Sequence, residues 1–244
     1  MPKKSTRLPV SKSRQFILSD DTQFAIKEAY KTARTNLVFA LAESESNIVV
    51  ITSCNPSEGK STNCLNMAIT MAETDAHVLL IDCDMRKPVQ HSLLYLDNKI
   101  GLSSVLGGIV CDVGKAIDKN VRPNLDVLTS GPIPPNPAEL ISGNKMGTLL
   151  ELVSDHYDYI FIDTPPANVV TDAILLNQRV AGIIFVMKEG HTRHEDIREC
   201  LAKVRMTNGR VLGVIRANCS AKGTKGGYKS YKYKYKYKNY ESYS

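Results

Sequence analysis

The stretch Ile48-Val-Val-Ile-Thr-Ser-Cys-Asn-Pro-Ser-Glu-Gly-Lys-Ser-Thr62 decides the fold of this chain. Its first residues form an apolar, β-branched run that predicts a strand, and the turn that follows ends in Gly59-Lys60-Ser61 and opens a helical pattern. Such a turn can cradle a polyphosphate, because successive backbone N–H groups and the helix N-terminus supply positive charge. The residues expected to contact the phosphates are Ser57, Glu58, Gly59, Lys60, Ser61 and Thr62.

Two further strands each end in carboxylates. One runs through Val78-Leu-Leu-Ile to Asp82-Cys-Asp84, and the other through Tyr159-Ile-Phe-Ile to Asp163. In an open α/β sheet ligands bind outside the carboxyl ends of the strands, so these acids and the loop are expected to converge on one crevice. Taken alone, each aspartate is equally typical of a turn or a helix cap. In combination they predict a site for ATP and Mg²⁺, although Cys54 replaces the first glycine of the usual G-x-x-x-x-G-K-[ST] pattern.

The rest of the chain alternates strand and helix patterns. Strands are expected at 48–52, 78–81, 125–128, 159–162, 183–187 and 211–215, and the clearest helices at 22–41, 60–73, 145–154 and 195–206. This order predicts an α/β fold with a doubly wound, mainly parallel sheet and helices on both faces, as in P-loop NTPases. We expect a flexible basic arm over residues 1–20, one P-loop domain over 21–220 and a disordered Lys/Tyr-rich tail over 221–244.

Composition narrows the class of protein. The 244 residues carry a net charge of +6, and residues 221–244 contain seven Lys and one acid, so the body is close to neutral. The N-terminal segment lacks the apolar core of a secretory signal, and no apolar run approaches the roughly 20 residues of a membrane span. The six cysteines show no C-x-x-C pairs, which argues against a zinc site or a disulfide framework. A cytoplasmic protein is expected.

These motifs together resemble the bacterial tyrosine kinases of capsular and exopolysaccharide synthesis, the BY-kinases, in their two-chain form. I-D-C-D-M-R-K-P at 81–88 is similar to that family's Walker A′ element, and F-I-D-T-P-P at 161–166 to its Walker B element. Two flanking segments, Gly101–Gly107 and Pro134–Ser142, also fit. Family members usually carry Pro-Gly-Glu-Gly-Lys in the loop, whereas Ser57 stands at the first of those glycines; a positive φ there would strain it by about 1 kcal/mol.

The resemblance implies an oligomeric ring and an adenine contact. Glu28, Lys31 and Arg34 are similar to the family's E-x-x-R-x-x-R interface motif, with Lys31 in place of the first arginine. On sequence alone the same spacing equally describes an exposed helix face held by i,i+3 pairs. Asn218 loosely matches the family's adenine-side asparagine, and Asn55 occupies the place of the extra lysine that marks partition ATPases.

The tail completes the resemblance. Seven of the 11 tyrosines lie in the last 17 residues, and in the family such a cluster is the autophosphorylation substrate; they are Tyr228, Tyr231, Tyr233, Tyr235, Tyr237, Tyr240 and Tyr243. In the mechanism we expect, Lys60 holds the β- and γ-phosphates, Ser61, Asp82 and Asp163 position Mg²⁺, and Asp84 accepts the tyrosine proton. Lys60, Asp82 and Asp84 are thus the expected catalytic residues.

The resemblance also implies partners. They are a transmembrane activator of the polysaccharide co-polymerase type, further copies of the chain, and a cognate tyrosine phosphatase, with the protein held at the inner face of the plasma membrane by the activator. No nucleic acid is expected. Two alternatives stay open: a partition- or positioning-type ATPase whose basic tail binds DNA or anionic membrane, and a non-catalytic nucleotide-binding scaffold.

Overall fold

A single seven-stranded sheet organises the computed structural model, which describes residues 10–218. The strand order is β3-β4-β2-β5-β1-β6-β7. The strands are β1 (Ile48–Ser53), β2 (Val78–Asp82), β3 (Ile117–Arg122), β4 (Leu125–Leu128), β5 (Tyr159–Asp163), β6 (Gly182–Lys188) and β7 (Val211–Ala217). Every neighbouring pair is parallel except β3 and β4, which are antiparallel. The predicted α/β class with a mainly parallel sheet is confirmed.

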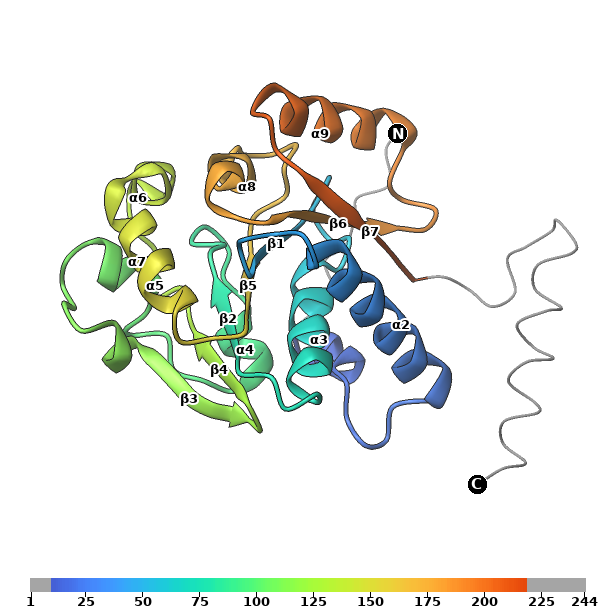
Figure 1. The fold of residues 1–244 in the computed structure, drawn as a ribbon, viewed down its shortest axis with the longest axis horizontal. Coiled ribbons are helices and arrows are strands. Elements are labelled where there is room, and N and C mark those ends of the chain that lie inside the picture. Colours follow the sequence, from blue (N-terminus) through green and yellow to red (C-terminus); the bar gives the residue numbers. More distant parts are fainter. Residues whose placement is uncertain (1–9, 219–244) are drawn as a thin grey trace, which may run out of the picture.

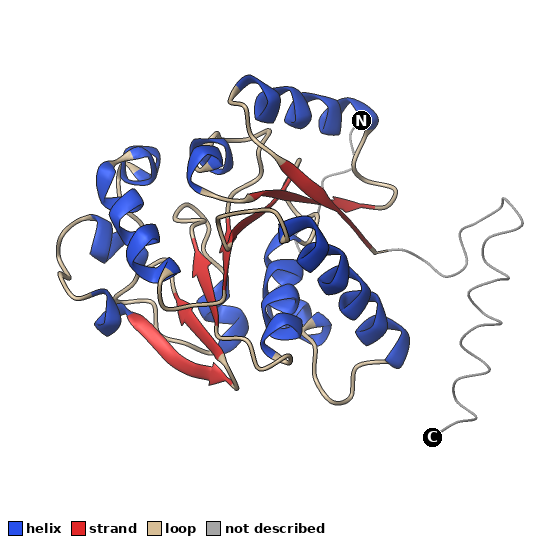
Figure 2. Cartoon of the chain, in the orientation of Figure 1, coloured by secondary structure: helices blue, strands red, loops and turns tan. Residues whose placement is uncertain are grey.

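Helices cover both faces of this sheet (Figures 1 and 2). On one face lie α2 (Phe24–Leu41), α3 (Lys60–Ala72) and α4 (Gln90–Leu94). The other face is covered by α5 (Leu102–Leu106), α6 (Pro137–Ser142), α7 (Asn144–Ser154), α8 (Asp172–Leu175) and α9 (His194–Met206). The remaining short elements are α1 (Val10–Ser13) and the 3-10 turns η1 (Arg14–Phe16), η2 (Val113–Ala116) and η3 (Asn177–Arg179). The result is a three-layer α/β/α arrangement.

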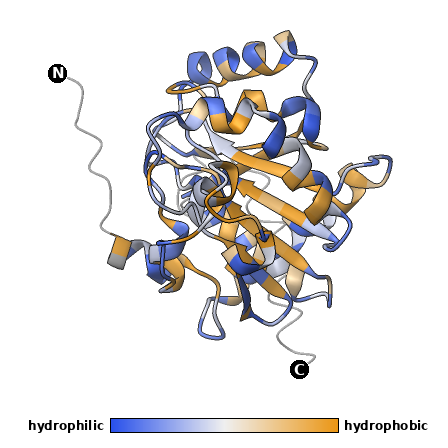
Figure 3. Ribbon diagram, turned by 90° about the vertical axis from the view of Figure 1, so that its left-hand side faces the viewer, coloured by the Kyte–Doolittle hydropathy of each residue, from blue (hydrophilic) through white to orange (hydrophobic). Residues whose placement is uncertain are grey.

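The central strands are apolar on both sides. In β1, Ile48 and Val50 pack into the core under α5–α9, whereas Val49 and Ile51 pack into the core under α2 and α3. The hydropathy colouring shows the central strands largely in orange, whereas the helices carry both blue and orange residues (Figure 3). A strand buried on both faces needs apolar residues at every position, which is why these strands are visible in the sequence as continuous apolar runs.

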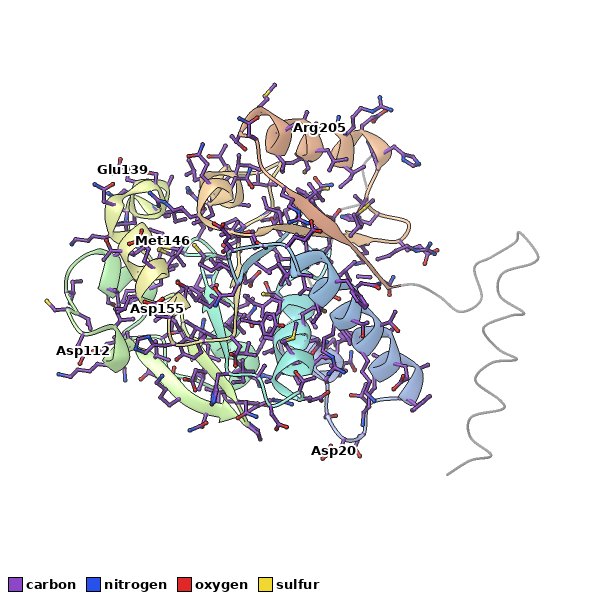
Figure 4. The ribbon with its side chains drawn as sticks, in the orientation of Figure 1. Asp20, Asp112, Glu139, Met146, Asp155 and Arg205 are labelled. Carbon is purple, nitrogen blue, oxygen red and sulfur yellow. The ribbon has the colours of Figure 1, made fainter. Side chains whose placement is uncertain are left out.

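Several charged side chains lie at the periphery of the described structure. Asp20, Asp112, Glu139 and Arg205 are exposed, whereas Met146 of α7 is fully buried (Figure 4). Among residues 10–218, no helix is both long enough and apolar enough to cross a bilayer. The predicted tail over 221–244 falls outside the described residues.

All six predicted strands and all four predicted helices are present, with ends shifted by two residues or fewer. One strand was not predicted, the antiparallel edge strand β3. Its sequence, Ile117-Asp-Lys-Asn-Val-Arg122, is polar and mostly half-buried or exposed, because an edge strand has solvent beside it. The helices of four to six residues were also not predicted, since they are too short to show a helical period.

The N-terminal segment packs on the domain from Val10 onward, so the prediction of a flexible arm is wrong for this part of residues 1–20. The Arg14 side chain donates from Nε to the backbone oxygen of Ser92, 2.9 Å away, and stacks over the ring of Tyr95 at 3.5 Å. Leu18 is buried and its N–H donates to Asn66 Oδ1 at 2.9 Å. A basic polar composition did not reveal these specific contacts.

Gly101, the first residue of one of the segments that fit the family, lies against backbone at the end of β4. A Cβ atom at this position would overlap the backbone of Thr129 and Gly131. We therefore expect Gly101→Ala to lower the free energy of unfolding by about 3 kcal/mol, because the clash is with main chain that cannot turn aside. The measurement is urea unfolding. Gly213→Ala is the matched control, since no atom lies within 4 Å of a Cβ built there; equal stability of the two variants would contradict this explanation.

Candidate nucleotide and phosphoryl-transfer site

The loop between β1 and α3 has the backbone shape of a phosphate-binding turn. It runs from Cys54, which is fully buried, to Gly59, the residue before the first turn of α3. Gly59 has a φ of +90°, and Ser57 has a φ of +66°. Both values lie in the left-handed region, where a serine is strained and a glycine is not. The strain anticipated at Ser57 is therefore present in the fold.

Glu58 anchors this loop to the rest of the domain. Its buried carboxylate accepts a hydrogen bond from the Asn55 backbone N–H at 2.9 Å and another from the Thr192 hydroxyl at 2.7 Å. Lys188 reaches the same region, with its Nζ 3.4 Å from the Ser57 oxygen. Glu58 was predicted to contact phosphate, but its side chain is occupied within the protein. Its backbone is what remains available to a ligand.

Lys60 lies at the centre of the site. Its ammonium donates to Asp84 Oδ2 at 2.9 Å, to Asp163 Oδ1 at 3.2 Å and to Ser61 Oγ at 3.1 Å. Burial, the largest single effect, would lower the pKa of this lysine, but the combined attraction of Asp163, Asp84 and Asp82 raises the pKa above its ordinary value. The loop lysine and the two predicted strand-end acids are thus brought together, as the sequence predicted.

The register of the sheet explains this convergence. Asp82 and Asp163 are paired residues at the ends of the neighbouring strands β2 and β5, and β5 also lies beside β1, which leads into the loop. Parallel strands present their carboxyl ends at one edge of the sheet. Three segments far apart in sequence therefore deliver their polar side chains to the same place.

The three aspartates are not equivalent. Asp82 Oδ1 accepts from the Asp84 backbone N–H at 3.1 Å, and its Oδ2 accepts from the Val89 and Gln90 N–H groups at 3.1 and 3.0 Å. Burial, followed by repulsion from Asp163, raises the pKa of the Asp82 carboxyl to about 7. Asp82 thus orders the loop that carries Asp84, whereas Asp84 and Asp163 are the acids that pair directly with Lys60.

Gln90, the first residue of α4, is a member of the site that the sequence analysis missed. Its fully buried side chain donates from Nε2 to Asp163 Oδ2 at 2.9 Å and to the Ser61 backbone oxygen at 3.0 Å. Together with its backbone bond to Asp82, these contacts join the loop helix and both acidic strands. A glutamine after a proline turn carries no sequence signal for such a role; only its position in space reveals it.

The donor set fits a hydrated magnesium ion. The hydroxyl of Ser61 and the carboxylates of Asp163 and Asp82 are hard oxygen ligands, of which Mg²⁺ commonly takes one or two while keeping several waters. Among the described residues, Gln90 Oε1 is a buried acceptor without a hydrogen-bond partner, which suits a water ligand beside these groups.

The structure shows no hydrogen bond or ion pair between the other predicted residues and the cluster of Lys60, Asp84 and Asp163 within the described range. Thr62 is half-buried in the first turn of α3, and Asn218 is exposed just beyond β7, whose last residue, Ala217, pairs with Lys188. On α2, Lys31 pairs with Glu28 at 2.8 Å, and Arg34 donates to the Thr70 oxygen at 2.7 Å. The seven tail tyrosines lie outside the described residues.

Comparison with known proteins identifies the family of this chain. The model of a family described as an AAA domain matches residues 46–207. Tyrosine-protein kinase YwqD of Bacillus subtilis is 40% identical over 188 residues, which cover 77% of this chain and 79% of that protein. The chain belongs to the bacterial tyrosine kinase family. Its fold is also that of the kinase domain of Escherichia coli tyrosine kinase ETK, with a TM-score of 0.77 and 30% identity over 92% of this chain and 87% of that chain.

The same fold also occurs in proteins that are not named as kinases. A plasmid partition protein from Borrelia burgdorferi superimposes with a TM-score of 0.58 at 24% identity, covering 73% of this chain and 84% of that chain. Tyrosine kinases of this family and partition ATPases therefore share an architecture. The side chains of the site, rather than the fold, must carry the difference in chemistry.

Ser57 offers a test of the strained loop. Ser57→Gly is expected to raise the free energy of unfolding by about 1 kcal/mol, because glycine adopts a φ of this kind without a Cβ clash. Thermal unfolding should show a rise of about 2–4 °C. Asn208→Gly is the control, since asparagine already tolerates its own φ of +53° there. No gain in stability from Ser57→Gly would show that the residue is not strained.

Proposed function

We propose that this kinase transfers the γ-phosphoryl group of ATP to the tyrosines of its own C-terminal cluster, from one copy to another within an oligomer. The observation that carries the proposal is the contact of Lys60 with both Asp84 and Asp163 at the start of α3. A loop lysine held between two carboxylates at the mouth of a phosphate-binding turn is the arrangement needed to hold a metal-bound triphosphate against an acceptor.

Magnesium ATP would supply the phosphoryl group and neutralise its developing charge. The chain's own groups then have separate tasks. Lys60 and the loop N–H groups hold the β- and γ-phosphates, so Lys60 exchanges part of its contact with Asp84 and Asp163 for phosphate oxygens. Ser61, Asp82 and Asp163 would hold the metal directly or through water, and Asp82 also keeps the Asp84 loop in place.

Asp84 is the proposed base. Releasing Lys60 to the phosphates frees Asp84 Oδ2, while Oδ1 still accepts from the Lys87 backbone N–H at 3.0 Å and fixes the carboxylate. A carboxylate is a much weaker base than a phenolate, so Asp84 is a poor base before the reaction begins. Its proton transfer belongs late in the step, once P–O bond formation has acidified the phenol.

Chain length supports this choice of acceptors. The seven tyrosines lie 10 to 25 residues beyond Asn218, and extended chains of those lengths span at most about 35 to 90 Å. Tethering also raises the local concentration of the acceptor to about millimolar. The phosphorylated tyrosines can therefore belong to the same copy or to a neighbouring copy. We favour a neighbouring copy because the family resemblance implies a ring.

A partition-type ATPase is the weaker candidate. Asn55 stands where such ATPases are expected to carry a second loop lysine, and its side-chain Nδ2 donates to Asp196 Oδ2 at 2.9 Å. In this chain Asn55 thus ties the loop to α9, and as a neutral residue it provides no positive charge for a phosphate. This contact favours the kinase over the ATPase.

The biological setting is proposed from the resemblance. A separate transmembrane activator would hold the kinase at the inner face of the membrane, α2 with Glu28, Lys31 and Arg34 would contact another copy, and a tyrosine phosphatase would reverse the modification. Control of capsular or exopolysaccharide synthesis and export would be the outcome. In the described structure Arg34 contacts Thr70, so an intermolecular role would require Arg34 to make a second contact or to exchange this one.

Incubation with γ-labelled ATP, Mg²⁺ and the cytoplasmic tail of the activator tests the product. We expect label on tyrosines between Tyr228 and Tyr243, located by mass spectrometry, and little free phosphate. A chain in which all seven are replaced by Phe keeps the nucleotide site and is the control. Free phosphate stimulated by DNA or anionic vesicles, without labelled tyrosine, would instead identify a partition-type ATPase.

Replacing the proposed base tests the mechanism. Asp84→Asn should lower the rate of transfer at least about 100-fold, because general-base catalysis is typically worth 10²- to 10⁴-fold. Binding of Mg²⁺-ADP, measured by titration calorimetry, should change much less. Asp97→Asn, at an exposed acid paired with Lys99, is the control. Full transfer by Asp84→Asn would exclude Asp84 as the base.

A further inference from the structure

We propose that Tyr30 is a positioning residue for the nucleotide site, acting through Asn63 on the carbonyl of Gly59. Tyr30 lies on α2, and Asn63 lies on the first turn of α3. The proposal rests on the proposed function only in placing a nucleotide on the loop before α3. It does not depend on tyrosine being the acceptor.

Asn63 connects Tyr30 to the backbone of the loop. Gly59 O accepts two hydrogen bonds from Asn63, one from the backbone N–H at 3.0 Å and one from side-chain Nδ2 at 2.9 Å. The Tyr30 hydroxyl donates to Asn63 Oδ1 at 2.9 Å. Both ends of the Asn63 amide are thereby engaged, so it is held with Nδ2 toward Gly59.

Asn66 determines the direction in which the Tyr30 hydroxyl donates its hydrogen bond. Asn66, fully buried on α3, donates from Nδ2 to the Tyr30 oxygen at 3.0 Å and to the Phe16 backbone oxygen at 2.8 Å. Asn66 Oδ1 accepts from the Leu18 N–H at 2.9 Å. Because Tyr30 accepts from Asn66, its own proton is left to be donated to Asn63. Burial raises the pKa of Tyr30, which keeps that proton in place.

Holding Gly59 O has a consequence for phosphate binding. A trans peptide is planar and directs its C=O and its N–H to opposite sides. With the Gly59 oxygen drawn toward Asn63, the N–H of Lys60 in the same peptide points away from Asn63. Backbone N–H groups at this place in the loop are the ones that bind phosphate oxygens. The contact therefore orients a donor that the site needs.

Tyr30 links the hydrogen bonds at Asn63 and Gly59 to helix α2. Tyr30 lies between Glu28 and Lys31 in sequence, and Arg34, one turn further on, donates to the Thr70 oxygen of α3. Because the Tyr30–Asn63 bond joins α2 to α3, a movement of one helix relative to the other would act directly on it. Loop order and assembly through α2 are then coupled, and such coupling acts in both directions.

Titration calorimetry with Mg²⁺-ADP on the full chain tests the proposal without any turnover. Tyr30→Phe keeps the ring and removes the hydroxyl, so we expect an affinity about three- to tenfold weaker. Asn63→Ala should weaken binding by a similar factor. The double variant should be no weaker than the more affected single variant, because both changes break one chain of contacts.

Tyr157→Phe is the matched control. Its hydroxyl also makes two hydrogen bonds, with Lys119 Nζ and Asp126 Oδ2, each at 2.7 Å, but on β3 and β4 and not at the loop. It should lower thermal stability and leave Mg²⁺-ADP affinity unchanged. Unchanged affinity in Tyr30→Phe, or additive losses in the double variant, would overturn the proposal. If Tyr30→Phe folds poorly, Asn63→Ala alone tests the proposal, because an unchanged Mg²⁺-ADP affinity in that variant would also overturn it.

Discussion

The rest of the site depends on the buried ammonium of Lys60. A charge removed from water must be paired, and Lys60 finds Asp84 at 2.9 Å and Asp163 at 3.2 Å. Asp82 is buried at the end of the neighbouring strand, and burial, followed by repulsion from Asp163, raises the pKa of its carboxyl to about 7. A site in which carboxylates outnumber the ammonium is suited to a divalent cation. Lys60 is already paired with Asp84 and Asp163, so a triphosphate that binds here must replace part of those contacts with contacts to its own oxygens.

The loop that presents Lys60 is shaped by side chains outside it. Glu58 is held by Thr192 near the start of α9, and Gly59 by Asn63 on α3. These contacts come from both faces of the sheet. A left-handed serine such as Ser57 persists only where its surroundings determine the backbone more strongly than its own preference does. The strain and the anchoring contacts are therefore two aspects of one preorganised turn.

An architecture shared with partition ATPases leaves the chemistry to a few positions. Asn55 ties the loop to Asp196, where a lysine would instead add charge to the phosphate site. Asp84 faces Lys60 from a loop after β2 that Asp82 holds through three backbone N–H groups. The fold supplies a crevice at the strand ends, and these side chains decide what the crevice can do.

The sequence by itself determined six of the seven strands, the four main helices, and the convergence of Lys60, Asp82, Asp84 and Asp163. Doubly buried strands must be apolar throughout, and parallel strands must end at one edge, so both follow from local pattern. Only the tertiary structure decided that Gln90, Asn63 and Tyr30 support the site, that Glu58 turns inward, and that residues from Val10 pack on the domain. Their roles arise from hydrogen bonds between segments far apart in the chain. Such bonds depend on distance and direction in space, which local pattern does not encode.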